Sequence, residues 1–301
     1  MTLYRIRFEL HSAIVTPFKG DTIWGHIVWG IANQEGDTAV AGFLDQAKSD
    51  SPALVVSSAF PAGMLCRPLP PPQERDGSLN ISRYSELKKD KKRKYLPTSD
   101  YFYGTETSIE IHEDPVKSIQ VMHNTIDRET NNVLNGGLYT TEEKWYGIRD
   151  KNNRWKNLEW DLYILSSFSP DRIKQLVEWA FENGYGADSS TGKGKIEIKD
   201  EPVEVKPKKQ GNTYMALGPF VNTKNSISNI RADIFIRSGK IGGAFASSLS
   251  PYKKPVVLYD EGAVFDCDTS IEYTGKLLED MHETAKRICQ SGFAPVIPIY
   301  S

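Results

Sequence analysis

The sequence predicts an α+β protein of two domains, the first of which carries a long insertion. Three observations indicate this class. Segments of alternating polar and apolar residues recur along the chain, amphipathic helical patterns lie between some of them, and residues 61–155 show no clear periodicity. A chain of 301 residues is expected to hold one or two domains. We expect the first domain to span residues 1–205, with the insertion at about 61–155, and a smaller second domain to span 206–301.

The first strand and helix are the plainest local patterns. Residues 3–11 alternate between polar and apolar side chains, which predicts a half-buried strand. After a turn, Asp21 or Thr22 can cap a helix. The apolar face of this helix carries Ile23, Trp24, Ile27, Val28 and Ile31. A shorter helix at about 39–48 and a strand at 53–58 complete this part.

A second strand–helix–strand unit follows the insertion. Residues 158–168 alternate again, Ser169 and Pro170 suit the start of a helix, and 195–199 predict a strand. The total order is strand, helix, strand, insertion, strand, helix, strand, which is the βαββαβ order of a ferredoxin-like domain. Beyond a linker at 202–211, we expect strands at 214–221, 230–236, 255–259 and 293–300, and a helix at about 276–290.

Composition limits the classes of function. The net charge of −2 is unusual for a protein that binds nucleic acid through bulk charge, so any RNA contact must come from a local patch or from backbone amides. Three widely spaced cysteines match neither a disulfide framework nor a metal site, which favours the cytoplasm. No apolar run approaches the length needed to cross a bilayer, so no membrane partner is expected.

Residues 184–194 are unusually rich in small residues, with four glycines, two serines and one threonine. Such a backbone can turn freely and present its amides to an anion, and Lys193 and Lys195 add positive charge. The alternative is a mobile helix-to-strand loop, and composition alone leaves the two open. The order of glycine and lysine excludes a nucleotide-binding P-loop.

A second polar segment lies inside the insertion, at residues 123–130. Arg128 offers a guanidinium fork for phosphate, and Ile126 or Tyr139 can pack on a base of single-stranded RNA. The alternative is an exposed loop with a surface pair of Asp127 and Arg128, and composition alone favours this alternative.

The sequence predicts no catalytic residue, no metal ligand and no cofactor. None of the five histidines lies at metal-ligand spacing from other ligands, and no nucleophile signature accompanies them. The best alternative is a metal-independent endoribonuclease, with His26 or His123 and a nearby lysine as acid and base. A third hypothesis is a pure protein scaffold.

Taken together, the chain resembles the RAMP superfamily of CRISPR-associated proteins. Within it, the resemblance is to the subunit that caps the 5′ end of the guide RNA in type III-A (Csm) effector complexes. Seven segments carry the resemblance in the family's order, and each is weak alone. They are Thr16-Pro17 with 20–26, 57–61, 123–130, the glycine-rich loop, Lys240-Ile241-Gly242-Gly243, 254–259 and 261–265.

The resemblance implies two ferredoxin-like (RRM-like) domains, with a thumb hairpin in the insertion that kinks the guide RNA. It implies a non-catalytic RNA-binding subunit in antiviral defence. For the endoribonuclease alternative, it implies guide-RNA precursor as the substrate. Its partners would be guide RNA, the large polymerase-like subunit and the backbone-repeat subunit, with target RNA contacted only indirectly.

The resemblance also implies which residues meet RNA. The tag would bind Ser189, Ser190, Thr191, Gly192, Lys193 and Gly194. The base of the thumb would hold Asn124, Ile126, Asp127, Arg128 and Thr130. The start of the first helix would present Gly20, Asp21, Thr22 and His26.

Overall fold

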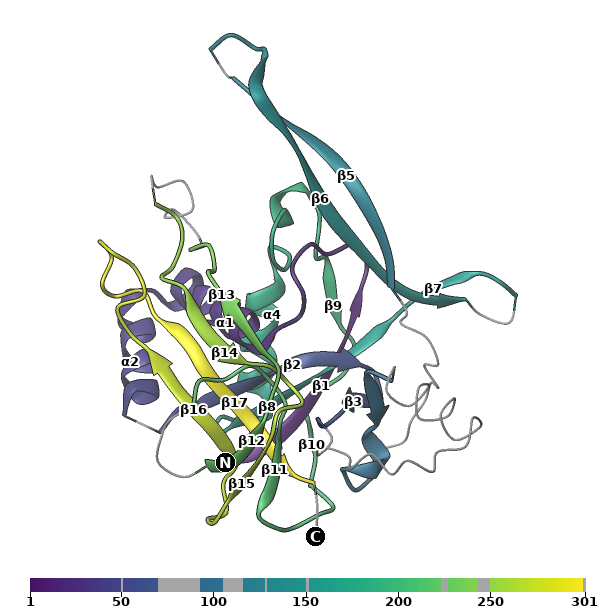
Figure 1. The fold of residues 1–301 in the computed structure, drawn as a ribbon, viewed down its shortest axis with the longest axis vertical. Coiled ribbons are helices and arrows are strands. Elements are labelled where there is room, and N and C mark those ends of the chain that lie inside the picture. The colour runs from purple at the N-terminus through teal and green to yellow at the C-terminus, as the bar shows by residue number, and fades with distance from the viewer. Residues whose placement is uncertain are drawn as a thin grey trace, which may run out of the picture.

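The computed structural model describes residues 1–49, 51–69, 93–104, 116–127, 129–149, 152–222, 227–242 and 250–299. Within these ranges the protein is mostly strands, with three α-helices on one side and a long hairpin that projects from the body (Figure 1). No helix in the described ranges is long and apolar enough to cross a membrane.

The first sheet is built from the strands predicted on either side of the insertion. All of its pairings are antiparallel. Across the sheet the strands are β2 (Leu54–Pro61), β8 (Glu159–Ser166) and β1 (Thr2–Leu10), with β9 (Ile196–Ile198) and β10 (Val203–Glu204) both along the outer edge of β1. The predicted order of elements through residue 199 is confirmed.

Three helices flank this sheet, namely α1 (Gly20–Glu35), α2 (Asp37–Lys48) and α4 (Pro170–Phe181). The start of α4 is as predicted, since the Ser169 hydroxyl accepts a hydrogen bond from the Arg172 amide at 3.3 Å. The predicted cap of α1 is wrong. The helix begins at Gly20, no side chain caps it, and Asp21 lies within its first turn. Gly20 allows this start because a Cβ there would lie 2.6 Å from the Val56 carbonyl oxygen of β2.

The face of the first sheet that lies opposite the helices is covered by other residues of the chain. The buried Asp161 carboxylate accepts hydrogen bonds from Arg7 Nε and from the Gly63 amide, both at 2.7 Å. Phe102 stacks on Tyr163 with ring centroids 5.3 Å apart, and both rings are fully buried. Tyr163 belongs to β8, whereas Phe102 belongs to the part of the insertion that holds β3 (Met64–Cys66), β4 (Tyr95–Pro97) and the 3-10 turn η1 (Thr98–Asp100). RRM modules bind bases on this face, and here it is covered.

The insertion also forms the projecting hairpin. Its strands are β5 (Val116–Ile126) and β6 (Val133–Arg149), and β7 (Trp155–Asn157) pairs with the lower end of β6. The register runs from Val116 opposite Tyr146 to Ile126 opposite Val133, with an irregularity beyond Asn124. We call this element the thumb hairpin. A hairpin in the insertion is therefore confirmed.

The second half of the chain forms another antiparallel five-stranded sheet. Its order is β12 (Ile227–Arg231), β15 (Val264–Cys267), β11 (Thr213–Ala216), β17 (Gln290–Pro298) and β16 (Tyr273–Leu278). A separate ribbon pairs β13 (Ile234–Arg237) with β14 (Val256–Tyr259). The predicted helix at 276–290 is wrong, because residues up to Leu278 pair with β17. Strand pairing overrides the local helical spacing.

One apolar core cluster spans both halves, and a second cluster lies within the second half. Met215, Phe293 and Ile297 of the second half belong to the same buried cluster as Ile27 of α1. The segment predicted as a linker is packed as well. Within it β10 pairs with β1, and the Val205 amide donates to the Leu3 carbonyl at 2.9 Å. Buried apolar contacts therefore cross the predicted boundary at residue 205.

Candidate RNA-binding surface

The glycine-rich loop runs from the end of α4 to β9 and is held against residues 12–17, which connect β1 to α1. It contains a single 3-10 turn, η2 (Ser189–Thr191). Hydrogen bonds of 2.7 to 2.9 Å join the Gly194 and Lys195 amides to Ala13 and Ser12, the Ala187 amide to Thr16, and the Tyr185 hydroxyl to Pro17. The loop is thus a tethered element, and the alternative of a mobile loop is not favoured.

Most amides of the loop are already used within it. Those of Thr191 and Lys193 donate to the Asp188 carbonyl, and that of Gly192 donates to Ser189. In the described ranges, no acceptor is found for the amides of Ser189 and Ser190. Few of the loop's amides are therefore available to an anion. The exposed portion is the short run from Ser190 to Gly192.

The two last glycines of the loop differ in their surroundings. Both Gly192 and Gly194 have positive φ, of 89° and 65°. Nothing lies within 4 Å of a Cβ built at Gly192. A Cβ at the buried Gly194 would instead overlap the Tyr185 backbone, lying 2.6 Å from its amide nitrogen. Gly194 is required by the fold of the loop, whereas Gly192 lies on the open side.

The loop is tied to the root of the thumb hairpin. Lys193 Nζ lies 2.7 Å from Glu143 Oε1, and Glu143 is a buried residue of β6. Next to it, Ile14 and Lys144 exchange two backbone hydrogen bonds of 3.0 and 2.8 Å. Residues 12–17 therefore contact both the loop and the hairpin, and these three segments form one continuous surface.

The polar segment of the insertion lies at the tip of the hairpin, and its predicted place at the base of the thumb is wrong. Roughly ten residues of β6 separate Glu143 from Val133, so the tip lies about 33 Å along the strand from the glycine-rich loop. Asn124, Ile126 and Thr130 are exposed there. Arg128 lies outside the described residues, as does Gly243 of the seven resemblance segments.

Asp127 has a structural role at this tip. Its carboxylate accepts a hydrogen bond from the Glu129 amide at 2.8 Å, and this bond lowers the pKa of the carboxyl group below its ordinary value. The Asp127 amide and carbonyl also bond to Asn132 and Asn131. Its side chain therefore stabilises the turn.

The thumb hairpin carries exposed apolar side chains on both faces. On one face His123 stacks on Tyr139, with ring centroids 5.2 Å apart and planes at 17°. Met122 and Leu138 lie on the other face and are 70% and 65% exposed. Sequence reasoning missed Met122 and Leu138, although an apolar residue on a solvent-facing strand position is the available signal.

The start of α1 contributes fewer exposed residues to the candidate RNA-binding surface than the sequence predicted. Gly20 and Asp21 are buried, and the Asp21 carboxylate accepts hydrogen bonds from Arg237 at 2.9 and 3.1 Å and from Gln290 at 2.9 Å. These bonds join α1 to the second half. Thr22 is only half-buried. Asp21 therefore acts within the fold, and its predicted place on an RNA-facing surface does not match its burial.

His26 contacts the glycine-rich loop. Its Nε2 accepts a hydrogen bond from the Gly186 amide at 3.2 Å, and its ring lies 5.0 Å from that of Tyr185. Burial lowers its pKa from 6.5 to about 4, so the ring is neutral at pH 7. The hydrogen-bonded ring supports the loop, and its low pKa and occupied Nε2 make it poorly suited to act as a general base.

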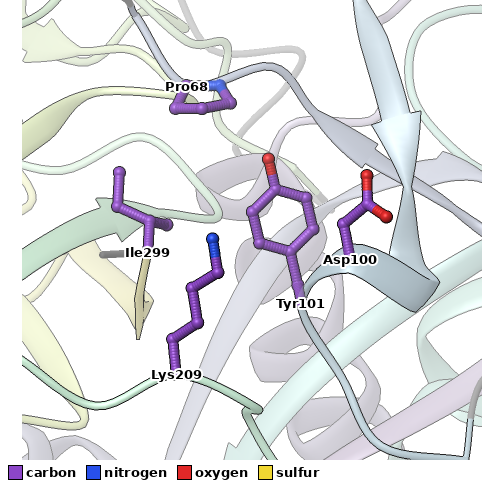
Figure 2. A pocket seen from close by; sticks show the side chains of 5 residues that line it. All are labelled: Pro68, Asp100, Tyr101, Lys209 and Ile299. Atoms are coloured by element: carbon purple, nitrogen blue, oxygen red, sulfur yellow. The ribbon is translucent and has the colours of Figure 1, made fainter. Parts of the chain in front are cut away.

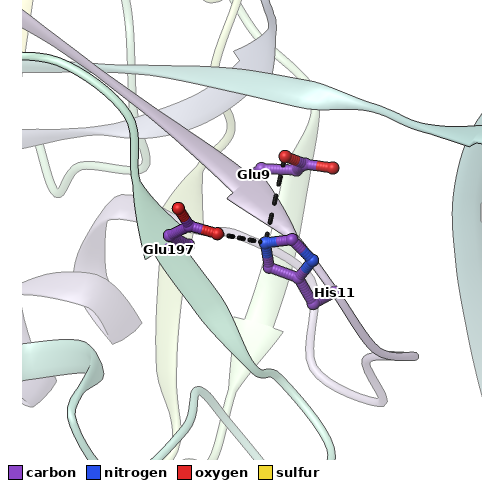
Figure 3. Close-up of side chains that lie close together, drawn as sticks. All are labelled: Glu9, His11 and Glu197. Carbon is purple, nitrogen blue, oxygen red and sulfur yellow. Dashed lines mark hydrogen bonds and ion pairs between the residues drawn. The ribbon is translucent and has the colours of Figure 1, made fainter.

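The structure also brings together three residues that sequence spacing did not connect, Glu9, His11 and Glu197 (Figure 3). Their ligand atoms lie within 4.8 Å of one another, and His11 Nε2 is 2.8 Å from Glu197. The Lys199 ammonium lies 2.7 Å from Glu9 and 3.2 Å from Glu197. A lysine therefore already balances these carboxylates, and the group is an ion-pair cluster.

A cavity of about 370 Å³ lies between the insertion and the second half of the chain (Figure 2). It is lined by Pro68, Asp100, Tyr101, Lys209 and Ile299. None of these residues belongs to the predicted RNA surface, so the cavity does not extend the candidate site.

No protein-family model matches the chain, and no curated protein sequence matches it. Solved structures do match. One is a Csm1–Csm4 cassette in complex with pppApA, at 16% identity and a TM-score of 0.58, covering 98% of this chain and 97% of that chain. Another is a Csm1–Csm4 cassette in complex with cA4, at 17% identity and 0.59, covering 99% of each chain. A third is a Csm3–Csm4 subcomplex of the type III-A CRISPR-Cas interference complex, at 12% identity and 0.55, covering 99% of each.

These similarities extend over nearly the whole chain, so they define its fold as a mixed α/β fold found in CRISPR effector assemblies. Csm4 is the component common to the two kinds of assembly. The chain therefore shares its fold with a chain of these Csm1–Csm4 and Csm3–Csm4 assemblies.

Proposed function

We propose that this chain is a non-catalytic RNA-binding subunit of a type III-A CRISPR effector complex, which holds the 5′ repeat-derived tag of the guide RNA. The observation that carries the proposal is the continuous surface formed by the glycine-rich loop, residues 12–17 and the thumb hairpin. Its partners would be a large polymerase-like subunit and a backbone-repeat subunit. The fold similarity to chains in Csm1–Csm4 and Csm3–Csm4 assemblies supports this assignment.

The surface suits phosphate at one end and bases at the other. Ser190 is exposed beside Lys193, and these two groups can donate to phosphate oxygens, whereas the Thr191 hydroxyl already donates to the Asp188 carbonyl at 2.8 Å. Along the hairpin, the stacked rings of His123 and Tyr139 offer a flat aromatic face on which a base can stack. With a net charge of −2, such a local surface would bind RNA weakly alone and more tightly within an assembly.

We further propose that the first half is a ferredoxin-like domain with a thumb-bearing insertion, with its boundary near residue 205. The antiparallel order β9/β10, β1, β8, β2, together with α1 and α4, supports this. The second half has an antiparallel sheet but no α-helix in its described residues. Its assignment to the same fold rests on the resemblance alone.

Guide retention in the reconstituted complex tests the function. Ser190→Ala combined with Lys193→Gln should lower the amount of guide RNA that stays bound as salt is raised, because both changes remove phosphate contacts. Lys206→Gln is the matched control, since Lys206 is an exposed lysine outside the surface. Equal retention by the double variant and the control would contradict the proposal.

Catalysis by the chain is tested separately. If it were a metal-independent endoribonuclease, the purified chain would cleave repeat RNA in the presence of a chelator, and His26→Ala would abolish cleavage. We expect no cleavage, because the pKa of His26 is lowered by burial and its Nε2 is already an acceptor. Cleavage that His26→Ala abolishes would overturn the non-catalytic assignment.

A further inference from the structure

The ion pair between Lys193 and Glu143 is unusual in its surroundings. Glu143 is 4% exposed, so its carboxylate is almost fully withdrawn from water. The Lys193 side chain is 24% exposed and lies directly after the exposed Ser190–Gly192 run. In the described part of the chain, Lys193 is the one cation within 4.0 Å of Glu143.

An ammonium group carries a single positive charge, so a phosphate that contacts Lys193 from the solvent side must share that charge with Glu143 or displace it. A buried carboxylate without its partner is costly, because it has lost the stabilisation of water. A phosphate that draws Lys193 outward would therefore leave Glu143 unpaired. Any RNA contact made by Lys193 has to compete with the existing ion pair.

We propose that Glu143 is a positioning residue that competes with RNA phosphate for Lys193, and so weakens and gates RNA binding at the loop. This inference rests on the proposed function. In the free chain the ion pair holds Lys193 against the root of the thumb hairpin. When a phosphate takes Lys193, that side-chain tie between loop and hairpin is released, because Glu143 belongs to β6. RNA binding at the loop is thereby coupled to the position of the thumb hairpin.

Glu143→Gln tests the competition, because it removes the charge and keeps the shape. The full chain would be titrated against a fluorescent single-stranded oligouridine of about ten nucleotides, over a range of salt. Glu143→Gln should tighten binding by roughly five- to thirtyfold, the range for a partly buried charge pair. Glu143→Leu should act in the same direction, since an apolar side chain suits this buried position.

Two comparisons separate a specific effect from a general change of charge. Glu142→Gln is the matched control, because Glu142 is the neighbouring exposed glutamate on the other face of β6. It should change the affinity less than Glu143→Gln does. In a Lys193→Gln background, Glu143→Gln should have no further effect on affinity.

The salt dependence supplies an independent readout. Lys193→Gln should reduce the slope of log affinity against log salt by about 0.7, the value for one phosphate contact on a single strand. Glu143→Gln should leave the slope unchanged. Equal effects of Glu142→Gln and Glu143→Gln, or an effect that persists without Lys193, would overturn the inference while the proposed function stands. Absence of RNA binding by the wild-type chain and all variants would overturn the inference, whereas guide retention in the reconstituted complex decides the proposed function.

Discussion

Replacing Gly194 with alanine is expected to destabilise the protein much more than the same change at Gly192. Both residues have left-handed backbone, which costs an alanine about 1–2 kcal/mol. Alanine also restricts the unfolded chain, which returns about 0.4–1 kcal/mol. At Gly192, where a new Cβ meets open space, the net cost should be about 1 kcal/mol or less.

At Gly194 the new Cβ would overlap the Tyr185 backbone. The loop must then move, and it would lose two hydrogen bonds of 2.9 Å, from the Tyr185 amide to Gly194 and from the Gly194 amide to Ala13. Each bond contributes about 0.5–1.5 kcal/mol. The total cost of Gly194→Ala is therefore about 2–4 kcal/mol.

Thermal unfolding of the two variants and the wild-type chain measures this difference. At roughly 2–4 °C per kcal/mol, Gly194→Ala should lower the Tm by about 4–16 °C, and Gly192→Ala by about 4 °C or less. Equal shifts for the two variants would refute the reasoning. Gly192→Ala is thus the variant with which RNA binding can be studied in a folded protein.

Further predictions concern buried charge, pH and base stacking. Asp21→Ala should lower the free energy of unfolding by about 3 kcal/mol, because it leaves the partly buried Arg237 guanidinium without its carboxylate partner. The RNA affinity per folded molecule should stay unchanged. Burial lowers the pKa of His26 to about 4, so its contribution to stability is present above pH 6.5 and is lost as the pH falls toward 4. Burial raises the pKa of Glu261 from 4.5 to about 7, so its contribution is present below pH 4.5 and is lost as the pH rises to 7. Chemical unfolding of His26→Gln and Glu261→Gln should therefore differ from wild type with opposite pH trends, and trends of the same sign would contradict this. Tyr139→Ala should weaken oligouridine binding by about 1–3 kcal/mol without changing the Tm, whereas Thr140→Ala on the opposite face should not.

Local sequence patterns correctly predicted the elements that depend only on neighbouring residues. Ser169 and Pro170 place the start of α4 through a cap that involves only the next turn, and the structure has that hydrogen bond. The alternation of residues 3–11 likewise predicted β1. The predicted helix at 276–290 failed because β16 is set by its antiparallel pairing with β17, and helical spacing carries no information about that pairing.

The candidate site likewise has features that neighbouring residues determine and features that only distant contacts determine. The glycine-rich loop was found from its composition, because positive φ and close approach favour glycine. Its link to the hairpin was not found, since Lys193 and Glu143 are joined only by the fold. Asp21 was misjudged for the same reason. Its partner Arg237 lies 216 residues away and cannot be inferred from the sequence around α1.

Crosslinking of the guide RNA in the assembled effector complex tests the central claim most directly. With a photoreactive nucleotide in the 5′ repeat-derived tag, the account predicts crosslinks to peptides that contain Ser190–Lys193, and these should fall in a Lys193→Gln complex. Crosslinks from the tag that leave this loop unlabelled, with the tag bound elsewhere in the complex, would contradict it.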